Sequence, residues 1–238
     1  MSDEQQSLPS HVQIDEQPLQ RQQLFHPRAN TVAKVSIIGG LLAVALAFFL
    51  WGVYTRSPYY TGATVTVDQP VPFSHKHHVG ELGIDCRMCH TSVEQSASAG
   101  MPATQTCMTC HSQIWANSPV LAPVHESFRS GVPIAWNRVY ELPGYVYFNH
   151  SIHVQKGIGC VSCHGQIDEM PLTAKAVPLT MQWCLNCHRA PEKYIRPRDE
   201  VFNTRWVAQD QLTQGRKLVD DYHIVAGGRL TNCSICHR

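Results

Sequence analysis

All ten cysteines of the sequence fall into Cys-x-x-Cys pairs, and each pair is followed directly by a histidine. Two thiols three positions apart project from one helical turn, so they can form thioethers with the two vinyl groups of one haem, and the next histidine can bind the iron. The pattern predicts five covalently bound haem c groups. The five motifs are Cys86, Cys89 and His90; Cys107, Cys110 and His111; Cys160, Cys163 and His164; Cys184, Cys187 and His188; and Cys233, Cys236 and His237.

Other chemistry of paired cysteines fits this spacing less well. Five disulfides would leave the histidine after every pair unexplained. Structural zinc needs four ligands per ion and normally combines two motifs at regular spacing. A redox-active dithiol needs one pair on a βαβ scaffold, and this chain has five pairs without that pattern.

The second axial ligands must come from the remaining nine histidines or from methionine. His11 and His26 precede a long apolar segment, and we expect them to be solvated. Seven candidates follow that segment: His75, His77, His78, His125, His150, His153 and His223.

An internal repeat selects four of these seven. The stretch from Phe73 to His78 and the stretch from Phe148 to His153 each hold a His-x-x-His pair that precedes two haem motifs. Residues 73–111 and 148–188 therefore form two copies of a predicted two-haem module. Residues at i and i+3 lie on neighbouring faces of one turn, so such a pair can give one ligand to its own module's haem and the other to a different haem. We predict His75, His78, His150 and His153 as distal ligands, and His77 as a solvated neighbour.

The fifth distal ligand is predicted to be His223. It precedes Cys233 by ten positions, the same offset as His150 before Cys160. His125 lies in a predicted helix from Ser118 to Gly131 and has no counterpart in the repeat. A methionine remains an alternative, and the candidates are Met101, Met170 and Met181.

Residues 35–54 form an apolar run without a charged side chain, with Trp51 and Tyr54 at its end. At 1.5 Å per residue, twenty residues span roughly 30 Å, the thickness of a bilayer core. A long polar stretch precedes the run and no convincing cleavage site follows it, so we expect an uncleaved anchor rather than a signal peptide.

Positive charges predict the orientation of this anchor. Arg21, Arg28 and Lys34 lie before the apolar run, whereas Arg56 alone lies just after it. The positive-inside rule then puts the N-terminus in the cytoplasm and the haem domain outside, on the periplasmic face of a bacterial inner membrane. The expected divisions are a cytoplasmic tail (1–30), a transmembrane anchor (31–55), two dihaem modules with a connector (56–190) and a C-terminal segment with the fifth haem (191–238).

Composition is consistent with this organisation. The net charge of +1 gives no indication of nucleic-acid binding, and the low charged fraction of 16% suits a surface covered by partner subunits. We expect a mainly α fold with long irregular loops, little sheet, a short helix on each haem motif and a further helix that ends near Tyr222. The haems would supply much of the apolar core.

Two classes of function are compatible with these features. The first is a non-catalytic electron-transfer subunit whose irons all have two axial ligands. The second is an enzyme, either a stand-alone NapC-type quinol dehydrogenase or a multihaem reductase with an open haem iron. Every motif ends in histidine, and there are enough histidines for five six-coordinate irons, which favours the first class.

The motifs resemble two known groups of proteins. The Phe and His-x-x-His blocks before the attachment motifs resemble class III and cytochrome c7 proteins over residues 73–111 and 148–188. Over nearly the whole chain the sequence resembles the pentahaem cytochrome c subunit of alternative complex III, a bacterial quinol:electron-acceptor oxidoreductase. The stretches that carry this resemblance are FSHKHHVGELGIDCRMCHTSVEQSASAGMPATQTCMTCHSQIW, VYFNHSIHVQKGIGCVSCHG, MQWCLNCHRAPEKYIRP and LTNCSICHR.

That resemblance implies partners that the residues themselves do not show. They are an iron–sulfur subunit related to molybdoenzymes, polytopic quinol-binding membrane subunits and a monohaem cytochrome c. It also implies that quinol is oxidised elsewhere in the complex and that this subunit passes electrons to a periplasmic acceptor in a respiratory or photosynthetic chain.

Overall fold

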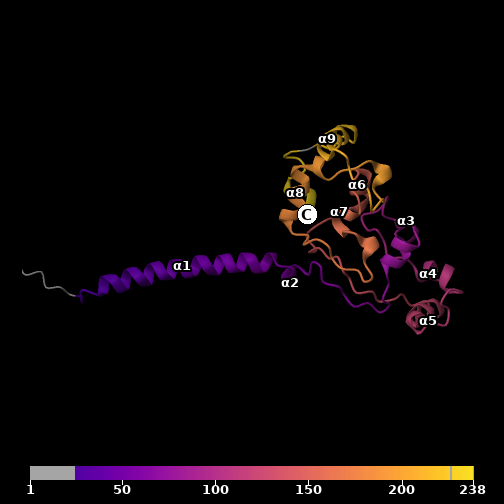
Figure 1. Ribbon diagram of the computed structural model, residues 1–238, viewed down its shortest axis with the longest axis horizontal. Helices are drawn as coiled ribbons and strands as arrows, with labels where there is room; N and C mark the ends of the chain where they lie inside the picture. Colours follow the sequence, from indigo (N-terminus) through magenta and orange to yellow (C-terminus); the bar gives the residue numbers. More distant parts are fainter. Residues whose placement is uncertain (1–24, 226, 238) are drawn as a thin grey trace, which may run out of the picture. The chain divides into compact units, whose positions relative to one another are not determined.

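The computed structural model describes residues 25–225 and 227–237 (Figure 1). The chain divides after Trp51 into two compact units, and the second contains all five haem motifs. The predictions for His11, for Arg21 and for most of the cytoplasmic tail fall on residues 1–24, outside the described part.

The first described element is the long helix α1 (Ala29–Arg56), which contains the predicted anchor. Its most apolar stretch has a mean hydropathy of 2.3, and none of its residues is buried. Within the described residues it is the one helix long and apolar enough to cross a membrane, judged by length and composition. A membrane anchor and a signal sequence both have these properties.

The haem-binding unit consists of short helices joined by long loops, as the sequence predicted. Between residues 52 and 237, leaving out 226, the pairing of extended backbone is limited to isolated bridges such as Ala63 with Lys175. The α-helices are α2 (Pro58–Thr61), α3 (Cys86–Cys89), α4 (Thr104–His111), α5 (Ala122–Ser130), α6 (His150–Gln155), α7 (Val161–His164), α8 (Met181–Arg189), α9 (Gln211–Asp221) and α10 (Cys233–Cys236). The other turns are the π-helical η1 (Lys76–Glu81) and the 3-10 helices η2 (Pro119–Leu121), η3 (Ile167–Glu169), η4 (Pro191–Lys193) and η5 (Arg198–Glu200).

Each of the five haem motifs lies on one of these helices, and three of the helices begin at a side-chain cap. Asp85 accepts a hydrogen bond from the backbone N–H of Arg87 at the start of α3. Thr180 caps α8 and Asn232 caps α10 in the same way. A single turn of helix is unstable alone, so a cap that satisfies a free N–H stabilises it.

The two His-x-x-His blocks have the same ring arrangement, although the first lies on a π-helical turn and the second on α6. The ring centre of Phe73 lies 4.9 Å from that of His75 and 4.4 Å from that of His78. Phe148 lies at 4.7 and 4.4 Å from the corresponding histidines. In each block the phenylalanine packs against both imidazoles and restricts their orientation.

Two predicted helices of the haem-binding unit are confirmed. The helix predicted from 118 to 131 forms as η2 followed by α5, and it ends at Gly131 with a φ of 73°. The helix expected to end near Tyr222 is α9.

The protein core is small. Eight apolar side chains of the described residues are buried: Ala63, Val71, Val93, Leu121, Val124, Ile195, Val201 and Leu218. One small cluster joins Val71, Leu121 and Val124 beneath α4, where Trp136 packs against it. Because so few side chains are buried, most of the interior must be formed by another apolar component, which we expect to be the haems.

Candidate haem-binding sites

We number the five sites by their motifs in chain order. Site 1 contains Cys86, site 2 Cys107, site 3 Cys160, site 4 Cys184 and site 5 Cys233. The ten cysteines form no disulfide.

At three sites the motif histidine faces a predicted distal histidine. The distances between ring centres are 6.2 Å for His78 and His111 at site 2, 6.4 Å for His150 and His164 at site 3, and 6.2 Å for His153 and His188 at site 4. Two imidazoles on opposite sides of one metal ion, each bound at about 2 Å, have ring centres roughly 6 Å apart. The separation therefore fits an iron between the rings.

Site 1 combines His90 with His75. The pKa of His75 is lowered to about 4, chiefly by burial and further by the charges of His90 and His78. The hydroxyl of Thr173 lies 3.0 Å from His75 Nδ1. Within each module, the first distal histidine therefore lies by the first motif and the second distal histidine by the second motif.

Main-chain carbonyls fix the tautomer of these histidines. An imidazole that donates from Nδ1 keeps the lone pair of Nε2 for a metal ion, and such bonds also orient the ring. Seven of the ten predicted ligands make this bond. The pairs are His78 with Ser74 (2.8 Å), His90 with Gly100 (2.8 Å), His111 with Ile114 (3.0 Å), His150 with Ala97 (2.9 Å), His153 with Asn149 (2.7 Å), His188 with Leu230 (2.9 Å) and His237 with Tyr145 (3.3 Å).

Site 5 differs from the other four sites. In the described residues the ring of His237 contacts the ring of Tyr145, at 5.8 Å, and makes no ring contact with His223. His223 is exposed just after α9 and has a φ of 51°. The structure therefore does not bring the predicted fifth distal ligand to its motif.

The other candidates for this position lie near other sites. Met101 follows Gly100, which binds the site 1 histidine, and Met170 lies against Gly165, which follows the site 3 motif. Met181 begins α8, which carries site 4.

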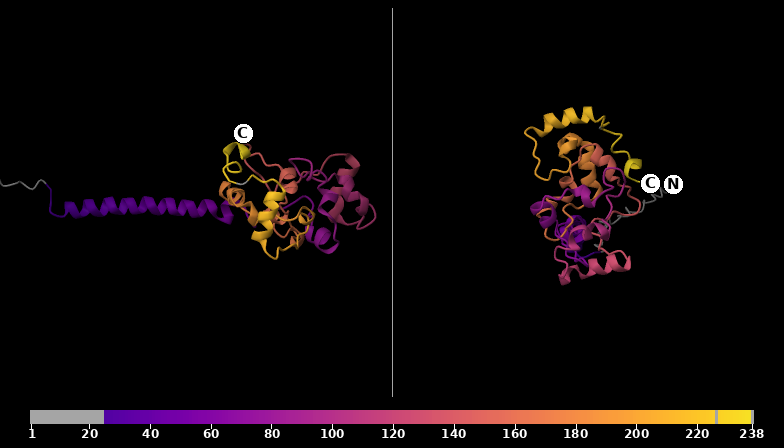
Figure 2. Two further views of the ribbon diagram at one scale, coloured as in Figure 1. Left: turned by 90° about the horizontal axis from the view of Figure 1, so that it is seen from above. Right: turned by 90° about the vertical axis from the view of Figure 1, so that its right-hand side faces the viewer.

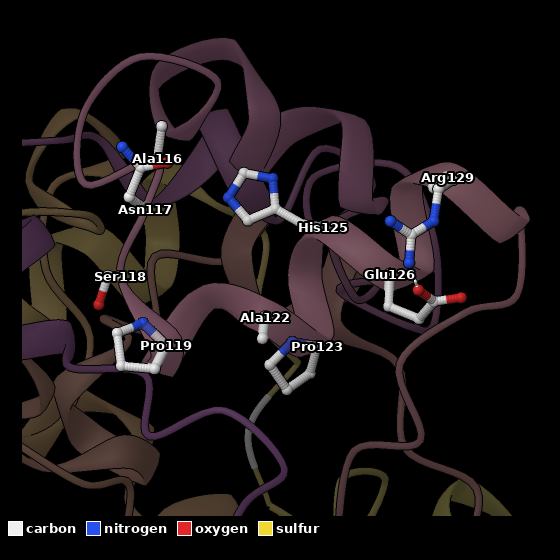
Figure 3. Close-up of a pocket in the computed structure, with 9 residues that line it drawn as sticks. All are labelled: Ala116, Asn117, Ser118, Pro119, Ala122, Pro123, His125, Glu126 and Arg129. Carbon is white, nitrogen blue, oxygen red and sulfur yellow. Dashed lines mark ion pairs between the residues drawn. The ribbon is translucent and has the colours of Figure 1, made fainter.

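His125 lies beside site 2, because α5 packs against α4. Figure 3 shows its ring pointing from α5 toward Ala116 and Asn117, in an open cavity of about 560 Å³. Its Nε2 atom is buried without a hydrogen-bond partner. Site 2 already has His78 opposite its motif histidine, so His125 is not needed there.

His77 is exposed, as predicted, but it is not merely solvated. Its Nδ1 lies 2.9 Å from a carboxylate oxygen of Glu81, and its ring stacks on Trp115 at 6.3 Å. His26, which precedes α1, is exposed and accepts a hydrogen bond from the backbone of Arg28.

The sites follow one another in the spatial order 2, 1, 3, 4, 5. At each junction, burial raises the pKa of one thiol, and a cysteine of the adjacent site lies near enough to raise it further when ionised. Cys89 acts in this way on Cys107, Cys86 on Cys160, Cys187 on Cys163, and Cys236 on Cys184.

Hydrogen bonds and the figures support this order. The backbone N–H of His150 donates to Ala97, so the distal turn of site 3 is joined to the loop after site 1. The bond from His188 to Leu230 joins site 4 to the segment before site 5. Both views of Figure 2 show α5, beside site 2, well away from the C-terminus that carries site 5.

Burial also affects the thiols of the inner sites. It raises the pKa of Cys160 to about 11, of Cys163 to about 12 and of Cys187 to about 11. Such thiols are protonated at neutral pH in the folded chain.

Two comparisons with known proteins bear on these sites. A family model described as cytochrome c7 and related cytochrome c matches residues 71–121 and 146–238. The chain belongs to this family. It is a multihaem cytochrome c of electron transport, and its five motifs attach five haem c groups.

Over 128 residues this cytochrome is also 34% identical to a protein of Nitratidesulfovibrio vulgaris, the multihaem cytochrome c subunit of menaquinone reductase. The match covers 52% of this chain and 55% of that protein, so the chain spans about half the length of this curated relative.

The side chains that pack against the candidate ligands and hold them in place were not predicted from the sequence. Tyr140 packs on the ring of His164 at 4.4 Å, and its hydroxyl donates to the carbonyl of Cys163. The same oxygen accepts from the backbone N–H of Ala176. Neither Tyr140 nor Thr173 lies at a repeated offset from a motif, so the spacing gave no signal for them.

Proposed function

We propose that this cytochrome is the electron-relay component of a membrane complex that exchanges electrons with a quinone pool. The supporting observation is the row of five haem sites, in which each site adjoins the next. Haem supplies one-electron redox chemistry at each site, and electron transfer needs closely spaced centres. The chain's own residues set the spacing and orient the imidazoles.

We further propose the axial ligand sets. The proximal ligands are the five motif histidines, and His75, His78, His150 and His153 are the distal ligands of sites 1, 2, 3 and 4. The ring spacing at sites 2 to 4 and the Nδ1 bonds support this assignment. At site 5 the repeat offset supports His223, which requires the segment between α9 and α10 to rearrange around the haem.

The finer proposal is a role within alternative complex III. The motif resemblance and the long apolar helix support it, and α1 would then be an anchor that keeps the haem domain on the periplasmic face. The relative in Nitratidesulfovibrio vulgaris belongs to a menaquinone reductase, so the opposite direction of electron flow is the alternative.

Isolation of the chain with its partners distinguishes these possibilities. Alternative complex III predicts co-purification with an iron–sulfur subunit, polytopic membrane subunits and a monohaem cytochrome c, together with reduction of the haems by a quinol. Reduction of menaquinone by the pre-reduced complex, without quinol oxidation, would instead support the role of the relative.

A pyridine haemochrome assay tests the relay itself. Five haems per chain are expected, and a value near zero would exclude any electron relay. A catalytic haem is the second candidate function, and the missing contact between His223 and His237 favours it at site 5 alone. A stoichiometric high-spin EPR signal in the isolated complex would support that candidate.

A further inference from the structure

Arg196 is a buried arginine beside site 3. It is 6% exposed, and its guanidinium carbon lies 4.9 Å from the ring centre of Trp206. One terminal nitrogen donates to the carbonyl of Asn203 at 3.0 Å, with a longer bond to the carbonyl of Glu200. Its Nε is buried without a hydrogen-bond partner.

No carboxylate of the described residues forms an ion pair with this guanidinium. Glu200, whose charge acts on this guanidinium, instead accepts a hydrogen bond from Asn203 at 2.7 Å. An arginine remains charged in a protein, so this is a fixed buried positive charge with incomplete compensation. Burying such a charge destabilises the fold unless something in the holo-protein compensates for it.

The charge lies against the backbone that leads into the site 3 motif. A Cβ at Gly159 would collide with the Arg196 guanidinium, so any other residue there would displace this charge from the backbone before Cys160. The next residue is Cys160, a haem-attachment cysteine. The charge also acts on this thiol: burial raises the pKa of Cys160, and Arg196 opposes that rise.

We propose that Arg196 raises the reduction potential of the haem at site 3, acting as a fixed positive charge in a position shielded from water. When the ferric haem accepts one electron, its total charge falls by one, so a nearby cation stabilises the reduced form. A unit charge roughly 10 Å from a redox centre, at an effective dielectric constant of about 20, changes the equilibrium constant roughly tenfold. The proposal rests on the haem at site 3 and not on the complex proposed above.

The experiment is a redox titration of the full-length holo-protein, with the haems resolved by their low-spin EPR signals. In Arg196→Gln, the midpoint potential of one haem is expected to fall by an amount equivalent to tenfold in the equilibrium constant, about 59 mV. The haems at sites 1 and 4, which adjoin site 3, should shift less. Arg196→Lys keeps the charge and should keep most of the potential.

Arg198→Gln is the matched control. Arg198 is two residues away, and its guanidinium also lies over an aromatic ring, that of Tyr222 at 4.1 Å, but its side chain is exposed. Solvent screens this charge, so its removal should leave all five potentials unchanged.

Three results would overturn the proposal. The first is an Arg196→Gln protein with five haems and unchanged potentials, and the second is an equal shift in Arg196→Lys. If the glutamine variant fails to fold, Arg196→Met is titrated in its place, because its apolar chain can still pack on Trp206. If neither uncharged variant folds while Arg196→Lys does, the role of the charge is structural and the proposal fails.

Discussion

Backbone carbonyls, rather than side chains, orient most of the candidate ligands. In His78 and His153 the acceptor lies four residues back in the same turn, and in His188 it lies in a distant loop, at Leu230. A carbonyl accepts only, so the imidazole must carry its proton on Nδ1 and present Nε2. The ligand state is thus set before the metal arrives.

The neighbouring histidines 77 and 78 give a direct test of the ligand assignment at site 2. His78→Ala removes the imidazole opposite His111 and should convert one of the five haems to a high-spin form. His77→Ala is the matched control, because His77 lies one residue away but contacts Glu81 and Trp115. EPR of the two purified holo-proteins gives the answer, and a high-spin signal in the His77 variant alone would reverse the assignment.

His223 allows a second test of the same kind. If it is the distal ligand of site 5, His223→Ala should make one haem high-spin, whereas His125→Ala should leave all haems low-spin. Electronic absorption and EPR spectra of both variants measure this. If the His223→Ala spectra stay low-spin, another side chain is the distal ligand of site 5. A high-spin haem in the unaltered protein would show that one iron lacks a second axial ligand.

At the residue scale, the five haem-attachment motifs could be read from the sequence. The Cys-x-x-Cys-His spacing is fixed by the dimensions of haem, so it is visible in the chain. The placement of His223 was less predictable, since the same offset from a motif can be reached by different loop paths. Between His150 and Cys160 the chain runs through α6 and the turn after it. His223, in contrast, lies just after the C-terminus of α9.

Among the elements, α9 depends on a close contact that the sequence pattern did not reveal. α9 packs against η4, and a Cβ at the buried Gly215 would collide with the carbonyl of Glu192. Gln211 on the same helix donates to the carbonyls of Glu192 and Ile195. Glycine inside a helix normally weakens it, so its value here comes from this approach of the two elements.

Gly215→Ala should therefore destabilise the fold. Overpacking of this kind costs about 1–3 kcal/mol, and for a chain of this size each kcal/mol lowers Tm by roughly 2–4 °C. Thermal unfolding of the holo-protein followed by circular dichroism measures the change.

Gly144→Ala is the control for that substitution, because nothing lies within 4 Å of a Cβ at this position. Its Tm should stay close to that of the unaltered protein. Equal changes in both variants would mean that the packing of α9 on η4 does not carry the stability assigned to it.

For the whole molecule, the small protein core means that folding depends on the haems. Eight buried apolar side chains cannot offset the conformational entropy of a unit this long. A chain with all ten cysteines replaced by serine should therefore be digested by protease within the haem-binding unit under conditions in which the holo-protein resists. A compact, resistant haem-free chain would contradict this dependence.

The order of the sites could not be predicted from the sequence. Along the chain the motifs run 1, 2, 3, 4, 5, but in space site 1 lies between sites 2 and 3. The reversal arises because the distal turn of site 3 binds the loop that follows site 1, through His150 and Ala97. Such a long-range contact between a side chain and a carbonyl leaves no periodic trace in the sequence. The repeat itself, the short motif helices and the long loops were predictable because local spacing determines them.

The most direct test of the electron relay is an experimental structure of the holo-protein with the five irons located by anomalous scattering. We predict one row in the order 2, 1, 3, 4, 5, with His78 and His153 bound at sites 2 and 4. A site detached from the row, or sites 2 and 5 lying next to each other, would contradict the predicted order.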